Sequence, residues 1–309
     1  MSFPIINDAL RLKRLQPSEG KIRMVLDTDT YNEVDDQFAV VYSLFSPEKF
    51  DVEAFYAAPF FNERSSGPKE GMQKSYDEIL RILDMVALDP DGLVFRGSQE
   101  YLAGPEQPSE SPAARDLVER AMSNAEDPLY VVAIGAITNV ASALLMEPRI
   151  IERIVLLWLG GQPLYWPSAR HFNLMQDLHA SRLVFDCGVP LIHFPCDGVT
   201  SHLITNLPEI QQYVRGQGRI GDYLAETFEG YYEDHYARTK EIWDIVTLAY
   251  LLNPGWMSTE LVHSPILTDQ LTWSVDHSRH LIRNITHIQR DPVFGDLFEK
   301  IGKYAASSG

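Results

Sequence analysis

The sequence predicts a single α/β domain with a central, mostly parallel sheet flanked by helices. The main observation is that continuous apolar runs of strand length alternate with helical patterns, as they do when helices cover both faces of a parallel sheet. A chain of 309 residues that is 45% hydrophobic can also bury a large core. Because no repeat, low-complexity tract or linker divides the chain, we expect one domain over residues 1–309.

Strands are predicted where a β-rich run ends in a polar or glycine-bearing turn. In chain order these runs are RMVLDTD (23–29), FDVEAFYAAPFFN (50–62), PLYVVAIGAITN (128–139), RIVLLWLGGQ (153–162) and VPLIHFPCDG (189–198). Helical patterns predict helices over residues 35–46, 74–88, 114–123, 139–146 and 244–253. Residues 202–242 look more helical than the rest, and we expect them to form an insertion or a lid.

Composition narrows the class of partner and the compartment. The formal net charge of −17 and the pI of about 4.9 argue against nucleic acid or an anionic membrane as a partner, because both bind basic faces. Cys187 and Cys196 form no CxxC pair, which favours a reducing compartment. The N-terminus lacks the apolar core of a signal peptide, and no apolar stretch is long enough for a membrane span. We expect a cytoplasmic protein.

An unusual acidic cluster follows the first apolar run. Four aspartates and one glutamate fall within ten positions of KIRMVLDTDTYNEVDD: Asp27, Asp29, Glu33, Asp35 and Asp36. One or two carboxylates there would be read as a solvated cap of the next helix. Five of them repel one another, so a bound cation is the better interpretation.

Several polar and glycine residues share a position with this cluster, because each lies at the carboxyl end of a predicted strand. They are Asp27, Asp29, Asn62, Gly135, Gly160, Gly161 and Asp197. In open α/β sheets ligands bind at that edge. We therefore expect the functional site at the carboxyl edge of the strands.

Two known carboxylate motifs are alternatives for this stretch. An EF-hand loop counted from Asp27 would need glycine at its sixth position and glutamate at its twelfth, where this chain has Asn32 and Phe38. The nucleophile motif of the haloacid dehalogenase phosphatases matches DTDT at 27–30. The later lysine and acidic pair of that family are not evident, and Asp35 and Asp36 would have no role in it.

More of the chain resembles the inosine-uridine nucleoside hydrolases. DTDTYNEVDD resembles the longer-loop version of that family's first motif, with two residues more than the commoner form between Asp29 and Asp35. Further landmarks occur in family order and extend the resemblance from residue 23 to about residue 254: VVAIGAITNVASALLMEPRI, VLLWLGGQ, FNLMQD and WDIVTLAYLLNP. The resemblance implies a Rossmann-like nucleoside hydrolase fold.

The resemblance also implies a Ca²⁺ ion at the bottom of the cleft. Its expected ligands are Asp29, Asp36, the backbone carbonyl of Ile134, and Asp244. This all-oxygen set, without histidine or cysteine, suits Ca²⁺. Asp29 is also the expected base for the attacking water, which reaches the anomeric carbon through an oxocarbenium-like state. The sugar hydroxyls are expected to bind Asp35, Asn62 and Asn173.

Two positions depart from the family pattern. Trp243 stands where the best-known members carry a proton-donating histidine, and a purine-specific branch also has tryptophan there. Since an indole stacks on flat rings, Trp243 favours a purine leaving group. His171 stands where a glutamate usually binds the 5′-hydroxyl; it can donate a hydrogen bond and carry charge near neutral pH, so the group bound there can differ. Tyr236 is a further candidate for the base pocket.

The resulting prediction is Ca²⁺-dependent hydrolysis of the N-glycosidic bond of a ribonucleoside or related riboside. One alternative is a relative that binds a sugar or riboside without hydrolysing it, or that has an altered substrate. The other is the phosphatase interpretation of DTDT. Because members of the family are dimers or tetramers, we expect a homodimer or homotetramer.

Overall fold

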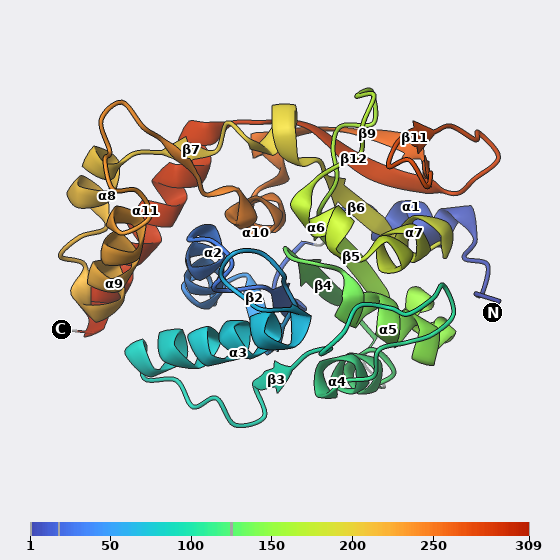
Figure 1. The fold of residues 1–309 in the computed structure, drawn as a ribbon, viewed down its shortest axis with the longest axis horizontal. Coiled ribbons are helices and arrows are strands. Elements are labelled where there is room, and N and C mark those ends of the chain that lie inside the picture. The colour runs from blue at the N-terminus through green and yellow to red at the C-terminus, as the bar shows by residue number, and fades with distance from the viewer. Residues whose placement is uncertain (1, 18, 124–125, 309) are drawn as a thin grey trace.

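The computed structural model describes residues 2–17, 19–123 and 126–308, and these form one domain around an eight-stranded sheet (Figure 1). The strands lie in the order β3 (Val94–Arg96), β2 (Phe50–Ala57), β1 (Ile22–Thr28), β4 (Leu129–Ala133), β5 (Ile154–Leu159), β6 (Leu191–Phe194), β12 (Leu281–Ile288) and β9 (Met257–His263). Every neighbouring pair is parallel except β12 with β9. The predicted fold class, an α/β domain with a mostly parallel sheet, is confirmed.

Helices cover both faces of this sheet. They are α1 (Asp8–Arg14), α2 (Asp35–Leu44), α3 (Pro68–Met85), α4 (Pro112–Ala121), α5 (Thr138–Met146), α6 (Phe172–Gln176), α7 (Leu178–Asp186), α8 (Leu207–Tyr213), α9 (Gly218–Glu229), α10 (Val246–Leu252) and α11 (Arg290–Ser308). Because side chains alternate along a strand, β1 contributes Met24 and Leu26 to one hydrophobic cluster and Val25 to the other. The first cluster lies under α2, α3, α10 and α11, and the second under α4, α5 and α7.

The five predicted strands all exist, but some end earlier than the apolar pattern suggested. The run 50–62 leaves the sheet after Ala57, and the run 128–139 leaves it after Ala133, before α5 begins. Strands β3, β9 and β12 and helix α11 were not predicted. β9 and β12 form the antiparallel edge and are only partly buried, so they lack the continuous apolar run of a central strand.

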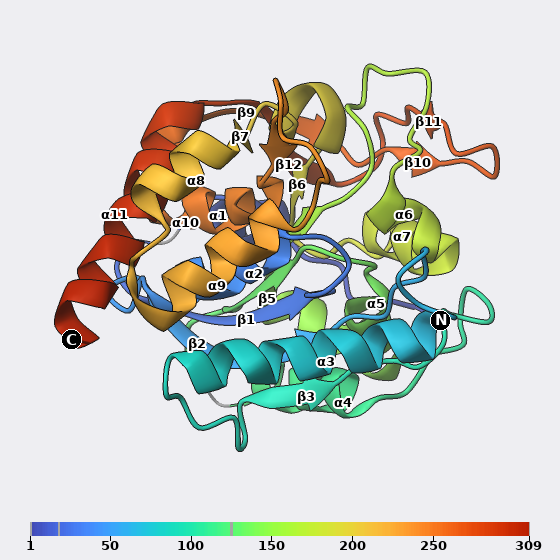
Figure 2. The ribbon, with the colours of Figure 1, turned by 60° about the vertical axis from the view of Figure 1, so that its left-hand side comes forward.

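Residues 202–242 are largely helical. They contain α8 and α9 between the short strands β7 (Ile204–Thr205) and β8 (Lys240–Glu241), which pair with each other. Figure 2 shows α8, α9 and α11 gathered at one end of the molecule, away from the β10–β11 hairpin (Ile266–Leu267 and Trp273–Ser274). Apolar residues of α8 and α9, such as Ile210 and Leu224, join the same hydrophobic cluster as α2. That residues 202–242 act as a lid stays a prediction.

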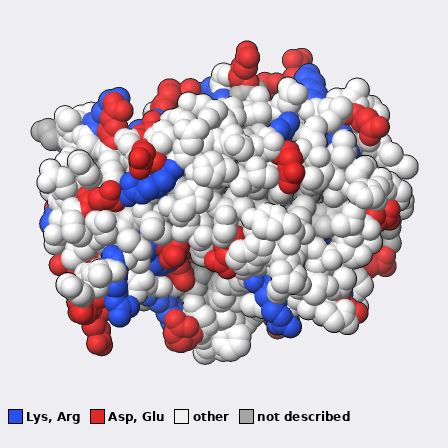
Figure 3. All heavy atoms as spheres, turned by 90° about the horizontal axis from the view of Figure 1, so that it is seen from above, with Lys and Arg blue, Asp and Glu red and all other residues white. Residues whose placement is uncertain are grey.

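The surface of the molecule is mixed in charge. On the face seen in Figure 3, acidic and basic side chains are interspersed among uncharged ones. Ion pairs link several of the charged residues of the molecule, for example Arg23 with Glu53 at 2.5 Å. Within the described ranges, no helix is both long and apolar enough to cross a membrane.

Candidate active site

The candidate site lies where the strand order of the sheet reverses. The chain runs outward from β1 to β3, returns to β4 beside β1, and then continues outward to β6. In open α/β sheets, ligands bind at the carboxyl ends of the strands on either side of such a switch point. Asp29 follows β1 there, and Ile134 follows β4. A cavity of about 300 Å³ opens at this point, lined by Asp29, Asn32, Glu33, Asp35, Asp36, Asn62, Glu63, Ile134, His171, Phe172, Asn173, Trp243 and Asp244.

Four aspartates from three segments converge in this cavity. Asp29 comes from the loop after β1, Asp35 and Asp36 open α2, and Asp244 lies in the short turn before α10. All four are at most 3% exposed. One carboxylate oxygen from each of Asp35, Asp36 and Asp244 lies within 4.8 Å of the others. The structure therefore brings together residues more than 200 positions apart in the sequence.

Burial makes the charged forms of these carboxylates unfavourable. It raises the pKa of Asp36 to about 7, although a hydrogen bond from the Thr28 hydroxyl at 2.6 Å acts in the opposite direction. Burial also raises the pKa of Asp29, and the charge of Asp36 raises it further. The pKa of Asp244 is raised by burial and then by the charge of Asp35. Burial and mutual repulsion therefore favour the protonated forms of these carboxylates, and a bound cation would favour the charged forms.

The donor set fits a metal ion. Asp29 Oδ2 and Asp35 Oδ2 are buried and have no hydrogen-bond partner among the described residues. An unpartnered buried carboxylate oxygen is costly, and a hard dication would satisfy it and favour the charged form. One oxygen of Asp35 also lies close to those of Asp36 and Asp244, and the sugar-binding role that the resemblance implies for Asp35 stays a prediction.

Asn173 is held firmly beside the expected carbonyl ligand. Its Nδ2 donates to the backbone oxygens of Ile134 at 2.7 Å and Leu159 at 2.9 Å. These two bonds turn its Oδ1 the other way, so the amide oxygen is free to accept a hydrogen bond from a ligand hydroxyl. The next residue after Ile134 must be small, because a Cβ at Gly135 would lie 2.6 Å from Asp29 Oδ1.

Asp27 is part of the framework under the site and does not line the cavity. It is fully buried at the end of β1, where its Oδ2 accepts a hydrogen bond from Asn139 Nδ2 at 2.9 Å. The same Asn139 side chain bonds the Ala57 carbonyl and the Ser98 N–H. One amide therefore joins the ends of β1 and β2 to Ser98, two residues after β3. A phosphatase nucleophile would have to be accessible, so this position argues against the phosphatase interpretation.

Trp243 and His171 lie next to each other in the lining of the cavity. Their rings meet edge to face with centroids 5.3 Å apart and an interplanar angle of 74°. Trp243 is half-buried and packs against the hydrophobic cluster on one side. Burial lowers the pKa of His171 to about 4, so the imidazole is neutral at pH 7. Its Nδ1 is buried and has no partner among the described residues.

The remaining sugar-site predictions have mixed outcomes. Asn62 lines the cavity, where its Nδ2 donates to Asn32 Oδ1 at 2.6 Å. Tyr236, predicted to contact the base, is 86% exposed and is not among the lining residues, so the structure does not bring it to the site. Its loop places it in solvent between α9 and β8.

The sequence analysis did not identify three of the lining residues, nor the contact between Lys240 and Glu33. Asn32, Glu63 and Phe172 line the cavity, and each is next to a residue or motif already singled out. Lys240 was assigned no role, yet it is 3% exposed and its Nζ lies 2.6 Å from Glu33 Oε2. Its Nζ also lies 5.8 Å from the centre of the Trp243 ring. Lys240, although distant in sequence, therefore holds Glu33 in the lengthened loop between Asp29 and Asp35.

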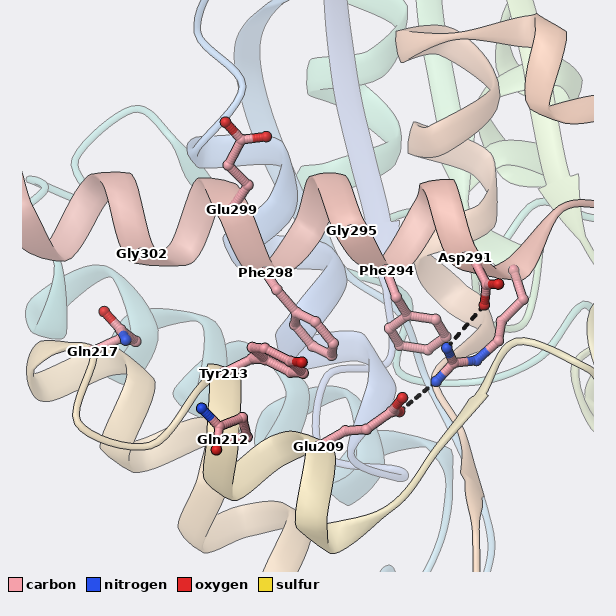
Figure 4. A pocket seen from close by; sticks show the side chains of 11 residues that line it. Glu209, Gln212, Tyr213, Gln217, Asp291, Phe294, Gly295, Phe298, Glu299 and Gly302 are labelled. Atoms are coloured by element: carbon pink, nitrogen blue, oxygen red, sulfur yellow. Dashed lines mark hydrogen bonds and ion pairs between the residues drawn. The ribbon is translucent and has the colours of Figure 1, made fainter.

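A second cavity of about 480 Å³ lies between α8 and α11 and has a different character. Figure 4 shows an arginine that bridges Glu209 and Asp291. That arginine is Arg290. The rings of Tyr213 and Phe298 stack nearby, with centroids 5.4 Å apart and an interplanar angle of 19°. This groove contains none of the buried aspartates and lies away from the switch point, so it is not the candidate active site.

Buried carboxylates that can hold a cation, placed at the switch point of a mostly parallel sheet, define an α/β protein with a small polar cleft. The chain belongs to the inosine-uridine preferring nucleoside hydrolase family, whose sequence model matches residues 24–292. The resemblance inferred from the sequence motifs is confirmed.

Curated relatives carry pyrimidine-specific names. The putative pyrimidine-specific ribonucleoside hydrolase RihB of Shigella boydii is 28% identical over 156 residues, which cover 48% of this chain and 63% of that protein. The chain thus spans less than two thirds of that relative. The pyrimidine-specific ribonucleoside hydrolase RihA of Escherichia coli O1:K1 is 26% identical over 267 residues, covering 76% of this chain and 81% of that protein.

Similar solved structures include proteins with purine-related names. A purine-preferring ribonucleoside hydrolase from Gardnerella vaginalis has a TM-score of 0.76 at 18% identity, covering 92% of this chain and 99% of that one. A structure named inosine-guanosine nucleoside hydrolase has a TM-score of 0.71 at 17% identity, covering 91% and 98%. At these identities the likeness establishes the shared fold.

Proposed function

We propose that the protein hydrolyses the N-glycosidic bond of ribonucleosides or related ribosides in a Ca²⁺-dependent reaction, with a purine as the favoured leaving group. The observation that carries the proposal is the buried cluster of Asp29, Asp35, Asp36 and Asp244 at the switch point. Family membership adds the reaction class.

The residues of the cavity support a division of roles. Asp29, Asp36, Asp244 and the Ile134 carbonyl would hold the ion, which when bound would fix the ribose hydroxyls and polarise a water. Asp29 Oδ2, buried and unpartnered, would accept the proton of the attacking water.

The sugar would be held by Asp35 together with Asn62 and Asn173. The orientation of Asn173, with its nitrogen on two backbone carbonyls, leaves its oxygen for a sugar hydroxyl. Neutral His171 also lines the cavity and would contact the end of the sugar that carries the 5′ group. Such contacts strengthen as the ring flattens toward the oxocarbenium-like state.

Trp243 supports the purine preference. It lies in the cavity beside the metal residue Asp244, and its ring can stack on a flat base. The pyrimidine-specific names of the sequence relatives make the opposite preference the competing prediction.

A panel of purine and pyrimidine ribonucleosides, assayed for reducing-sugar release in Ca²⁺, tests the proposal. We expect hydrolysis of at least one purine nucleoside and loss of activity in Asp29→Asn. Binding of a nucleoside without sugar release would support the non-hydrolytic alternative. Release of phosphate from a generic phosphoester, dependent on Mg²⁺ and lost in Asp27→Asn, would support the phosphatase instead.

We also propose a cytoplasmic homodimer or homotetramer. The reducing compartment is supported by Cys187 and Cys196, which are both buried and unbridged. Light scattering coupled to size exclusion measures the assembly, and a monomer at assay concentration would contradict the proposal.

A further inference from the structure

Glu33 lies in the lengthened loop between Asp29 and Asp35 and lines the active-site cavity. Its side chain is 35% exposed, and its Oε2 lies 2.6 Å from the Nζ of Lys240. Its other carboxylate oxygen, Oε1, has no hydrogen bond to any described residue. The protein therefore holds one oxygen of Glu33, and the other can accept a hydrogen bond from a ligand.

Lys240, on strand β8, holds Glu33 in place. It is 3% exposed, and its Nζ lies 5.2 Å from the centre of the Tyr231 ring and 5.8 Å from that of Trp243. Burial alone would lower the pKa of Lys240, but the charges of Asp35 and Glu33 raise it above its ordinary value, so the ammonium is charged at pH 7. Lys240 is not among the described residues that line the cavity. It therefore orients Glu33 and does not reach a ligand itself.

The charge of the cavity disfavours an anionic group on the ligand. Among the described residues, its lining contains six acids and neither lysine nor arginine. The acids are Asp29, Glu33, Asp35, Asp36, Glu63 and Asp244. A bound Ca²⁺ would offset two of their charges, and Lys240 offsets one more. A phosphate group would therefore meet an excess of negative charge.

One hydroxyl of the ribose has few partners under the proposed function. The ring hydroxyls would be held at the ion by Asp35, Asn62 and Asn173, which leaves the 5′-hydroxyl with neutral His171. Burial lowers the pKa of His171, and the charges of Asp197 and Glu33 act in the opposite direction, so Glu33 lies close enough to influence this imidazole. A carboxylate accepts a hydrogen bond from a hydroxyl there but repels a phosphate.

We propose that Glu33, oriented by Lys240, accepts a hydrogen bond from the 5′-hydroxyl of the ligand and restricts the site to ribosides with an uncharged 5′ end. The inference rests on the proposed function, because it uses the orientation of the sugar given there. It adds a substrate class, since free nucleosides are accepted and their 5′-monophosphates are rejected. Glu33 determines this specificity, and Lys240 is a positioning residue.

The test compares inosine and uridine with their 5′-deoxy analogues and their 5′-monophosphates, by release of reducing sugar in Ca²⁺. In the parent protein, loss of the 5′-hydroxyl should lower kcat/KM about ten- to 100-fold, because it removes a hydrogen bond to a charged group. The 5′-monophosphates should react at least about 100-fold more slowly than the nucleosides. Glu33→Ala should abolish the difference between nucleoside and 5′-deoxy analogue. Glu33→Gln should narrow it, and it is the second variant if Glu33→Ala folds poorly.

Variants of the neighbouring charges test how Glu33 is positioned. Lys240→Met should reduce the preference for the 5′-hydroxyl, and Lys240→Arg, which keeps the charge, should retain more of it. Glu241→Gln is the matched control, because Glu241 Oε2 lies 3.6 Å from the same Nζ but Glu241 does not line the cavity. It should leave the preference unchanged.

The outcomes separate this inference from the proposed function. If no compound is hydrolysed, the same compounds are titrated calorimetrically in Ca²⁺, and the same ratios are expected in Kd. Discrimination in binding without sugar release would overturn the proposed hydrolysis and keep the inference. Hydrolysis that is as fast without the 5′-hydroxyl, or as fast with a 5′-monophosphate, overturns the inference alone, as does an equal loss for both sugars in Glu33→Ala. Compounds that are neither bound nor hydrolysed would overturn both.

Discussion

Trp243 is held in place by its neighbours, with His171 edge-on to its ring and the Lys240 ammonium near its face. If a purine stacks on this indole, Trp243→Ala should lower kcat/KM for purine nucleosides by roughly five- to 150-fold, since base stacking is worth about 1–3 kcal/mol. Pyrimidine nucleosides should lose less. Trp243→Phe keeps a ring and should retain part of the activity; equal losses for both base classes would remove the purine preference.

The buried carboxylates predict how stability depends on pH when metal is absent. The pKa of Asp36 is raised from 3.8 to about 7 in the folded chain. Between these values the folded state therefore holds the Asp36 proton more often than the unfolded state does, so the contribution of Asp36 to stability falls as pH rises from about 4 to 7. The slope reaches at most about 1.4 kcal/mol per pH unit for each such group.

Urea unfolding in EDTA across this pH range measures the effect. Asp36→Asn should flatten the curve, because the amide does not titrate. With saturating Ca²⁺ the sign should reverse, since the ion binds the deprotonated carboxylates. A metal-free protein that is more stable at pH 7 than at pH 5, with Asp36→Asn unchanged, would contradict the pKa of Asp36.

Individual site residues were predictable from sequence where a local motif carries them. Asp29, Asp36, Asn173 and Asp244 all belong to short motifs, and the structure places each in the cavity. Lys240 has no motif, because its importance comes from a contact with Glu33 across 207 positions. Tyr236 was a misleading candidate for the converse reason, because an aromatic residue that is close to a site in sequence need not point into it.

At the level of elements, the Asn139 amide at the start of α5 joins three strands to one another. It bonds Asp27 on β1, the Ala57 carbonyl on β2 and the Ser98 N–H just after β3. Asn139→Ala should destabilise the fold by about 3 kcal/mol, because it leaves buried Asp27 without its one described partner.

Chemical denaturation measures this loss directly. The double variant Asp27→Asn with Asn139→Ala removes the stranded charge and should recover part of the stability, so the two changes should be strongly non-additive. Additive losses would show that the hydrogen bond between Asn139 and Asp27 contributes little.

Elements were predictable where their burial produces a simple pattern. The central strands β1, β4 and β5 are buried on both faces and show continuous apolar runs. β9 and β12 are partly exposed, and β3 has only three residues, so none of them has that signature. Their place in the sheet is decided by tertiary pairing.

At the level of the whole molecule, removing the proposed Ca²⁺ ion should lower the stability of the protein, because the ion would link the first loop, β4 and the turn before α10. Ligand linkage gives about 2.7 kcal/mol at a concentration about 100 times Kd, or roughly 5 °C in Tm for a domain of this size. Differential scanning fluorimetry with Ca²⁺, Mg²⁺ and EDTA measures it. Mg²⁺ should stabilise less, because it demands a tighter octahedral shell. Asp36→Asn is the matched control, and an identical Tm in Ca²⁺ and EDTA would exclude the proposed ion.

The wide spacing of the aspartates along the chain also has a consequence for biosynthesis. Asp244 is added 208 residues after Asp36, which at about 5–20 residues per second is roughly 10–40 s later. Until then the first acidic loop on the ribosome is a solvated segment with no complete cage for an ion. The proposed Ca²⁺ ion would therefore find its full set of ligands only in the finished chain, after the distant loops have closed on one another. The ion is therefore expected to slow unfolding rather than to speed folding.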